Sequence, residues 1–224
     1  MTEAARSLDF DRIREDMVER QIRTWEVFDQ AVLDLMKVVP RENFVPDSMR
    51  ALACADMNVP IGEGEVMLAP KVEGRMLQAL AITRGDSILE VGTGTGYFTS
   101  LLAGLGGQVH SVDIREQFTQ RAARNLKALD IDNVTLETRD ASTLDGFEQQ
   151  YDVIVVTGSM PVLHDSFRQR LKPNGRLLAI VGQDQVMEAQ LHTRTGENDW
   201  AIASLFDTVV PPLVNAWNPQ RFPF

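Results

Sequence analysis

Residues 88–97 read ILEVGTGTGY, a short apolar run that leads directly into a glycine-rich turn. The run has the composition of a buried strand, and glycine recurs at every second position after it. Glycine adopts positive φ without strain and lets a ligand approach the backbone closely. This stretch therefore predicts a binding turn at the end of a strand, and the question it raises is which ligand the turn holds.

The sequence around this turn alternates between strand and helix patterns. Strands are predicted at 87–91, 108–112, 133–137, 152–157 and 176–181, and helices at 97–105, 115–129 and 161–171. Such alternation predicts a mostly parallel sheet with helices on both faces. Two further strands, 187–195 and 200–206, flank the turn GEND, and 207–214 adds a third extended piece. They predict an antiparallel C-terminal edge, so the fold class is α/β.

The first 80 residues are helical by periodicity. Phe10, Ile13, Met17 and Ile22 mark one apolar face, Asp29 is placed to cap a second helix that Pro40 ends, a short third helix covers 46–54, and Pro70 is the first residue of a fourth. Residues 59–71, with two glycines and two prolines, predict an irregular loop. The predicted organisation is a helical cap with a loop over 1–80, followed by a Rossmann-like domain over 81–224.

Composition narrows the possible partners. The 224 residues carry a formal net charge of −10 and are 44% hydrophobic. A surface this acidic repels nucleic-acid backbones and anionic lipids, so neither nucleic acid nor membrane is an expected partner. The sequence has no apolar run of membrane-spanning length, no leader of signal-peptide type and a single cysteine, Cys54, so a cytoplasmic location is expected. Its three histidines are isolated, and no metal site is predicted.

Two features separate the candidate ligands of the glycine turn. The dinucleotide fingerprint G-x-G-x-x-G/A requires a small residue where this chain has Tyr97. Glu90 lies two residues before the first glycine, where a carboxylate disfavours pyrophosphate and favours a cationic ligand. Asp113, at the end of the second strand, can accept hydrogen bonds from ribose hydroxyls, although it could instead cap the helix that follows. A lone G-x-G-x-G is also compatible with a simple tight turn.

The ordered set E-x-G-T-G-T-G (90–96), Asp113, Asp140 and LKPNG (171–175) resembles the class I S-adenosylmethionine-dependent methyltransferases. This resemblance implies a Rossmann-like fold with S-adenosylmethionine as cofactor and S-adenosylhomocysteine as product. It places Gly92 and Gly94 under the methionine part of the cofactor and Glu90 near its ammonium group.

The same resemblance implies the rest of the cofactor site. Asp113 would bind the ribose hydroxyls, and Ile114 would pack on the adenine. Asp140 would meet the adenine amino group, with Ala141 supplying a backbone donor, although Asp140 could instead cap its own turn. Thr93 and Thr157 complete the predicted cofactor-binding set.

Longer segments narrow the resemblance. VPRENFVP (39–46), D-x-x-x-P-I-G-x-G (56–64), YDVIVVTGSMP (151–161), LKPNGRLLAIVG (171–182) and FDTVVPPLV (206–214) are similar to the protein-L-isoaspartate O-methyltransferase family, over about residues 12–214. The family transfers a methyl group to the free α-carboxylate of isoaspartyl residues in damaged proteins. The ester then cyclises to a succinimide, whose hydrolysis returns some normal aspartate.

The substrate loop, Glu65–Leu68, departs from the family pattern. The family's serine aligns with Leu68, its threonine with Val66 and its glutamine with Glu65, and Met67 lies between them. The loop thus exchanges two hydroxyls for hydrocarbon and one amide for an anion, which weakens its hold on an anionic nucleophile. No catalytic side chain is assigned, and the oligomeric state is not predicted.

Three hypotheses follow from this departure. Isoaspartyl methylation survives through backbone donors, or the enzyme methylates another acceptor such as a small molecule, or the protein binds S-adenosylmethionine without turnover. The aromatic tail 215–224, which extends beyond the family's last strand, is expected to dock on its own domain or on a partner chain.

Overall fold

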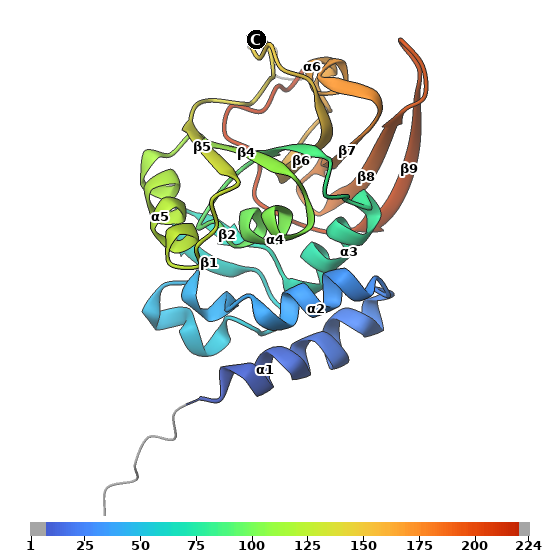
Figure 1. Ribbon diagram of the computed structural model, residues 1–224. Coiled ribbons are helices and arrows are strands. Elements are labelled where there is room, and N and C mark those ends of the chain that lie inside the picture. The colour runs from blue at the N-terminus through green and yellow to red at the C-terminus, as the bar shows by residue number, and fades with distance from the viewer. Residues whose placement is uncertain (1–7, 220–224) are drawn as a thin grey trace, which may run out of the picture.

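The computed structural model describes residues 8–219. Its centre is a seven-stranded sheet in the order β5-β4-β3-β6-β7-β8-β9 (Figure 1). The strands are β3 (Ser87–Val91), β4 (Gln108–Asp113), β5 (Val134–Thr138), β6 (Tyr151–Met160), β7 (Leu171–Gln183), β8 (Val186–Arg194) and β9 (Trp200–Asp207). The first five strands of this sheet run parallel, and β8 and β9 add the antiparallel edge. The predicted α/β fold class and its antiparallel C-terminal edge are confirmed.

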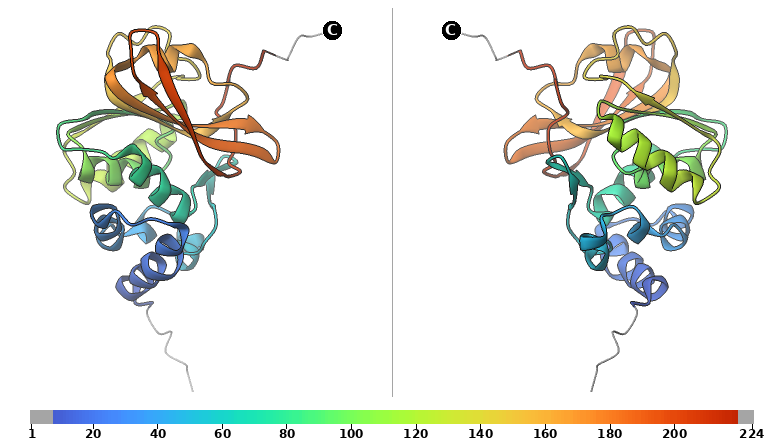
Figure 2. Two further views of the ribbon diagram at one scale, coloured as in Figure 1. Left: turned by 90° about the vertical axis from the view of Figure 1, so that its right-hand side faces the viewer. Right: turned by 90° about the vertical axis from the view of Figure 1, so that its left-hand side faces the viewer.

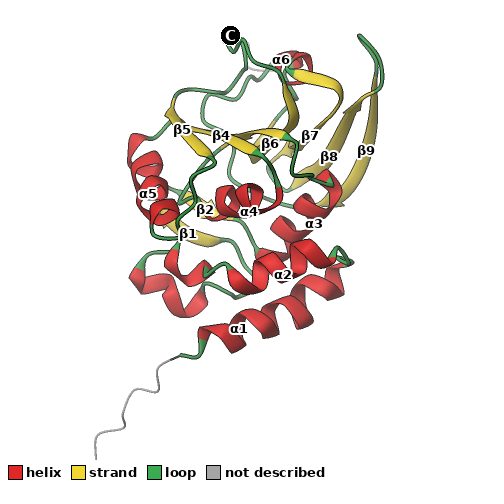
Figure 3. Cartoon of the chain, in the orientation of Figure 1, coloured by secondary structure: helices red, strands yellow, loops and turns green. Residues whose placement is uncertain are grey.

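The two faces of the sheet bury separate apolar clusters because successive side chains of a strand point to opposite faces. Ile88 belongs to one cluster and Leu89 to the other, and both are fully buried. The first face also packs against α4 (Tyr97–Leu105), α5 (Glu116–Lys127) and α3 (Pro70–Leu80). The second face is covered by α6 (Asp165–Gln169) and the segment 141–147 (Figure 3).

The N-terminal helices form a layer beneath the first face (Figures 1 and 2). They comprise α1 (Phe10–Met17), a π-helical turn (Val18–Ile22), a 3-10 turn (Arg23–Trp25), α2 (Gln30–Val38) and two further 3-10 segments (Arg41–Asn43 and Asp47–Leu52). Asp29 caps α2 as predicted, since its Oδ1 accepts a hydrogen bond of 2.9 Å from the Ala31 N–H. Pro70 is the first residue of α3, also as predicted.

The helical layer shares one core with the sheet. Val18 and Met36 of the layer lie in the same apolar cluster as Ile88 of the sheet. The predicted boundary between 80 and 81 coincides with the end of α3, where Ala81 takes a left-handed conformation. Within residues 8–219, no helix is long and apolar enough to cross a membrane.

Four local predictions are corrected. The predicted loop 59–71 contains a hairpin of β1 (Val59–Gly62) and β2 (Glu65–Met67), because Glu63 and Gly64 supply the two positive-φ residues of its turn. The 46–54 helix is a shorter 3-10 segment. The 161–171 helix shrinks to α6, because β7 already begins at residue 171. The 207–214 strand makes a single bridge, Ser159 to Pro212, since Pro211 and Pro212 have no N–H to donate.

Candidate functional site

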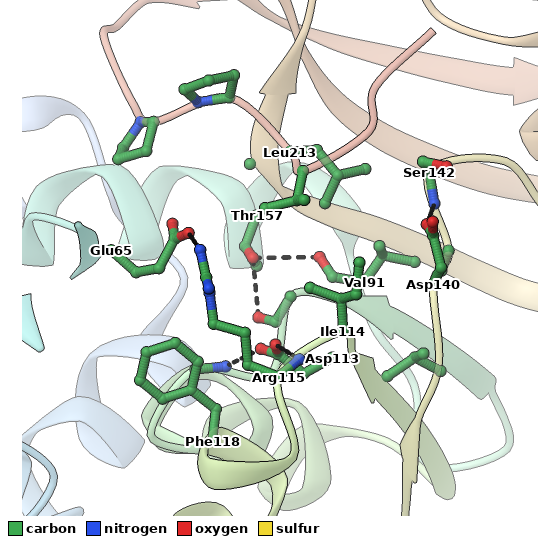
Figure 4. A pocket seen from close by; sticks show the side chains of 18 of the residues that line it. Glu65, Val91, Asp113, Ile114, Arg115, Phe118, Asp140, Ser142, Thr157 and Leu213 are labelled. Atoms are coloured by element: carbon green, nitrogen blue, oxygen red, sulfur yellow. Dashed lines mark hydrogen bonds and ion pairs between the residues drawn. The ribbon is translucent and has the colours of Figure 1, made fainter. Parts of the chain in front are cut away.

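A cavity opens at the carboxyl ends of the parallel strands, where the chain order of the sheet reverses between β4, β3 and β6 (Figure 4). Five segments supply its wall: the hairpin, the glycine turn, the end of β4, the loop after β5 and the crossing segment 211–214. The wall includes Gly92, Gly94, Asp113, Ile114, Asp140, Ala141 and Thr157 from the predicted cofactor set, and Glu65, Val66 and Leu68 from the predicted substrate loop. Residues far apart in sequence therefore converge on one site.

The glycine turn is held in its conformation by Thr157. The Thr157 hydroxyl donates to the carbonyls of Val91 and Gly92, at 3.1 and 2.8 Å. Gly92 has φ +102°, and a Cβ at this position would collide with the Thr157 hydroxyl. The turn therefore requires a residue without a side chain at position 92.

The third glycine of the turn has a packing role. A Cβ on Gly96 would lie 2.9 Å from the Ala122 Cβ, so glycine permits close contact between the start of α4 and α5. Tyr97, the residue that departs from the dinucleotide fingerprint, points into the core and is 1% exposed. Its ring packs edge-on against Phe44, with 5.4 Å between the ring centroids.

Asp113 bridges two walls of the cavity. Its Oδ2 accepts from the Gly94 N–H and its Oδ1 from the Arg115 N–H, both at 2.9 Å. Burial raises the pKa of this carboxyl, against the lowering effect of the two backbone donors. Helix α5 begins at Glu116 after Arg115, so Asp113 is not its cap residue. The alternative interpretation of Asp113 as a helix cap is therefore wrong.

Asp140 lies across the cavity from Glu65 (Figure 4). Its Oδ1 accepts from the Ser142 N–H at 2.9 Å, and its Oδ2 accepts from the Asn215 side chain at 2.8 Å. Burial alone would raise the pKa of Asp140, but these hydrogen bonds outweigh it and lower the pKa. Asp140 thus does close its own turn and also faces the cavity, and its contact with adenine stays a prediction.

Glu90 occupies a deeper position than its predicted role requires. It is fully buried and is not part of the cavity wall. Its Oε2 accepts from the hydroxyls of Thr99 and Ser111, each at 2.5 Å, and its Oε1 has no partner among the described residues. Burial raises the pKa of Glu90 to about 8. Its proximity to the cofactor ammonium stays a prediction.

The substrate loop folds as the β1–β2 hairpin and the residues after it. Val66 and Leu68 line the cavity, whereas Met67 is 5% exposed and pairs with Val59. The carboxylate of Glu65 forms an ion pair of 3.0 Å with Arg115. Arg115 was not identified from the sequence, because nothing local indicates that a hairpin 50 residues earlier would meet it.

A second, smaller cavity extends from the first, past the glycine turn. Val66, Leu68, Gly92, Gly94 and Thr157 line both. The smaller cavity adds Met67, Glu73, Thr93, Thr95, Tyr97 and Phe98 to these shared residues. The Thr93 hydroxyl lies 2.6 Å from that of Ser111, so the predicted cofactor residue Thr93 belongs to this end of the site.

A buried ion pair borders the smaller cavity. Arg41 and Glu73 are 0% and 1% exposed, and Arg41 Nη1 pairs with Glu73 Oε2. Arg41 also donates to the carbonyls of Leu68 and Ala53, and its guanidinium lies 4.5 Å from the centroid of the Tyr97 ring. This cluster was missed from the sequence, since each member looks like an ordinary surface or helix residue in isolation.

The site offers few free charges. The two arginines of the cavity wall are engaged: Arg115 by Glu65, and Arg139 by Glu137 at 3.7 Å and by the face of Phe147 at 3.9 Å. Across residues 8–219, no group of three His, Cys, Asp or Glu side chains could hold a metal ion. The donors that remain are backbone N–H groups and carboxylates, which suit an uncharged adenosine with a cationic substituent.

Comparison with known proteins identifies the family. A model of the family "Protein-L-isoaspartate(D-aspartate) O-methyltransferase (PCMT)" matches residues 12–217. "Protein-L-isoaspartate O-methyltransferase 1" of Rhodopseudomonas palustris is 37% identical over 90% of this chain and 82% of its own length. "Protein-L-isoaspartate O-methyltransferase" of Roseiflexus sp. is 32% identical over 96% of this chain and 99% of its own length.

A solved structure agrees in fold. The Plasmodium falciparum protein described as a protein-L-isoaspartate O-methyltransferase, in complex with S-adenosyl-L-homocysteine, superposes with a TM-score of 0.79 at 21% identity. The match covers 89% of this chain and 97% of that one. The family match over most of the chain, the relatives above 30% identity and the shared fold lead to one conclusion: the chain belongs to the protein-L-isoaspartate(D-aspartate) O-methyltransferase family.

Proposed function

We propose that this protein transfers a methyl group from S-adenosylmethionine to the free carboxylate of isoaspartyl residues in damaged proteins, with S-adenosylhomocysteine as the other product. The observation that carries this proposal is the convergence of the glycine turn, Asp113 and Asp140 on one cavity whose opposite wall is the substrate loop (Figure 4). Family membership supports it, because the relatives described above carry that activity in their names.

The residues present fit the cofactor. Gly92 and Gly94 expose backbone where a Cβ would intrude or strain the chain, which leaves room for a ligand against the turn. Asp113 is positioned to accept from ribose hydroxyls, and Asp140 to accept from an adenine amino group. S-adenosylmethionine, when bound, supplies a methyl group activated by the positive charge of its sulfonium.

The chain's own contribution is positioning and exclusion of water. An isoaspartyl carboxyl is ionised near pH 7, so its reaction requires no general base. Val66 and Leu68 present hydrocarbon to the cavity and thereby strip water from whatever nucleophile enters. Asp113 and the glycine turn hold the electrophile in a fixed orientation, which is where an in-line displacement gains most of its rate.

An adjoining groove has room for a peptide. Its volume is about 950 Å³, and it shares Glu65, Val66 and the segment 211–214 with the cofactor cavity. Its remaining wall includes Asn58, Gln183 and Asp184. A peptide lying in this groove would meet the cofactor cavity at Val66.

One observation favours a different acceptor. Val66 and Leu68 do face the cavity, so the hydroxyls that the family resemblance would place there are replaced by hydrocarbon at the site itself. Such a wall suits a less anionic or more apolar acceptor, such as a small molecule. A protein that binds the cofactor without turnover is the third possibility.

Incubation with methyl-labelled S-adenosylmethionine and an isoaspartyl peptide, beside its aspartyl twin, tests the proposal. We expect base-labile label on the isoaspartyl peptide alone. Transfer only to a component of a cell extract would favour the other acceptor. Cofactor binding with no transfer to either would favour the non-catalytic protein.

Restoring hydroxyls to the loop should improve peptide methylation. We expect Val66→Thr combined with Leu68→Ser to lower KM for the isoaspartyl peptide about tenfold, because hydrogen bonds to a charged group contribute about 1.5–3 kcal/mol each and part of this is lost to imperfect geometry. Steady-state kinetics with the peptide pair measures it.

The control for this pair is Ile202→Thr, which makes a similar exchange at an exposed position of β9 away from the site. Leu68→Ser also removes buried apolar volume, so Val66→Thr alone provides a variant with an intact core. An unchanged or higher KM in both loop variants would refute the argument that the lost hydroxyls matter.

A further inference from the structure

The smaller cavity beside the glycine turn contains unsatisfied polar groups that no residue of the family resemblance explains. The Tyr97 side chain is 1% exposed and lines this cavity, yet its hydroxyl has no hydrogen-bond partner among the described residues. A buried hydroxyl without a partner costs free energy, so it indicates a missing ligand group. Glu73, 1% exposed, lines the same cavity.

The position of this cavity identifies the part of the cofactor that belongs in it. Asp113, Ile114 and Asp140 line only the larger cavity, which is the expected adenosine end. The smaller cavity lies past Gly92 and Gly94, and its further wall comes from Thr95 and Tyr97 at the start of α4. A cofactor with its adenosine at Asp113 that crosses the turn would place its amino-acid end there.

We propose that Glu73 and Tyr97 form the binding site for the amino-acid end of the cofactor, with the Glu73 carboxylate accepting from the ammonium group and the Tyr97 hydroxyl donating to the carboxylate. This assignment rests on the proposed cofactor, S-adenosylmethionine. It moves the cationic contact from Glu90, which lies outside both cavity walls, to a side chain that lines the site.

The charges around Glu73 suit a zwitterion. Arg41 holds Glu73 from one side and lies against the Tyr97 ring on the other, so the wall presents an anion beside a donor that a cation polarises. Burial raises the pKa of Glu73 to about 7, although Arg41 opposes this. The other titratable groups that act on Glu73 or Tyr97 are Glu90 and Cys54, both buried. An incoming ammonium group would stabilise the ionised form of Glu73.

Two ligands that share the thioether adenosine isolate the amino-acid end. S-adenosylhomocysteine carries this end, and 5′-methylthioadenosine lacks it. We expect Glu73→Gln to weaken S-adenosylhomocysteine about 10- to 100-fold by isothermal titration calorimetry, and to leave 5′-methylthioadenosine within about twofold, because hydrogen bonds to charged groups are the strong ones. Tyr97→Phe should weaken only S-adenosylhomocysteine, by about 3- to 10-fold.

A third ligand separates the two contacts. S-adenosyl-3-thiopropylamine keeps the ammonium group but has no carboxylate, so Glu73→Gln should weaken it and Tyr97→Phe should not. Affinity of the wild type for S-adenosylhomocysteine should also rise between pH 6 and pH 8, because below its pKa the Glu73 carboxyl must first lose a proton. This rise should disappear in Glu73→Gln.

The outcomes are distinguishable. Equal loss of both thioethers in Glu73→Gln would mean general damage to the fold, and unchanged binding of 5′-methylthioadenosine excludes that. Since Glu73→Gln leaves Arg41 without its anion, Tyr97→Phe tests the same cavity in a variant that keeps the ion pair. If neither variant discriminates between the ligands, the assignment is wrong. If the wild type binds none of them, the proposed cofactor itself is wrong.

Discussion

Replacing Arg41 with methionine is expected to lower the free energy of unfolding by about 3–5 kcal/mol, since removal of one partner leaves the other charge of a buried ion pair uncompensated. Arg41 is fully buried and bonds Glu73, the Leu68 carbonyl and the Ala53 carbonyl, the last at 2.7 Å. Methionine has a similar volume but offers none of these donors. Urea denaturation followed by far-ultraviolet circular dichroism measures the loss.

A surface arginine provides the matched control. Arg20→Met removes an ion pair of 3.2 Å with Asp16, in which the arginine side chain is 78% exposed. Exposed pairs contribute about 0–1 kcal/mol, so this variant should be nearly neutral. If Arg41→Met cost no more than Arg20→Met, the buried cluster would not be what joins the helical layer to the substrate loop.

Loss of function should accompany any Arg41 variant that still folds. Arg41 holds the carbonyl of Leu68, the residue that lines both cavities. Without this bond the loop can shift relative to the glycine turn, and displacement of a positioning wall by about 1 Å costs up to about 100-fold in rate. The helical layer therefore serves the site as well as the core.

Asp113→Ala should reduce affinity for S-adenosylhomocysteine about 100-fold or more. A carboxylate that accepts from two ribose hydroxyls makes two charge-assisted hydrogen bonds, each of about 1.5–3 kcal/mol. The substitution also removes the acceptor that bridges the Gly94 and Arg115 N–H groups, which loosens the turn itself. Titration calorimetry measures the affinity.

Two further aspartates calibrate this result. Asp140→Ala should cost about tenfold, because Asp140 would make one contact with adenine and its two present donors, Ser142 and Asn215, are near the surface. Asp132→Ala, an exposed position outside both cavities, should have no effect. Undiminished binding in Asp113→Ala, or affinity of the wild type for a nicotinamide dinucleotide instead, would contradict the interpretation of the glycine turn.

The local sequence was sufficient to predict the sheet. Strands such as 87–91 and 108–112 carry continuous apolar runs, which parallel strands need because both of their faces are buried. Once the strands are parallel, Asp113 and the glycine turn must lie at the same edge, since each follows the carboxyl end of its strand. The predicted cofactor residues thus converge for a topological reason.

Local patterns were weaker where neighbouring chain segments decide the structure. The hairpin over 59–67 was missed because its glycines and prolines are typical of loops, and only pairing between Val59 and Met67 makes it a sheet. The helix expected over 161–171 lost its second half to β7, whose residues pair with β6. In both cases hydrogen bonds to another segment outweigh the intrinsic preference of the chain.

The sequence by itself determined the class of fold, the place of the cofactor turn and the apolar character of the substrate loop, because these follow from periodicity and from residue types at fixed spacing. Tertiary structure alone decided that Arg41 meets Glu73 and Leu68, that Arg115 meets Glu65, and that Glu90 lies behind the site rather than in it. Contacts between residues about 30 to 50 positions apart depend on how the layers pack, and no local pattern encodes that packing.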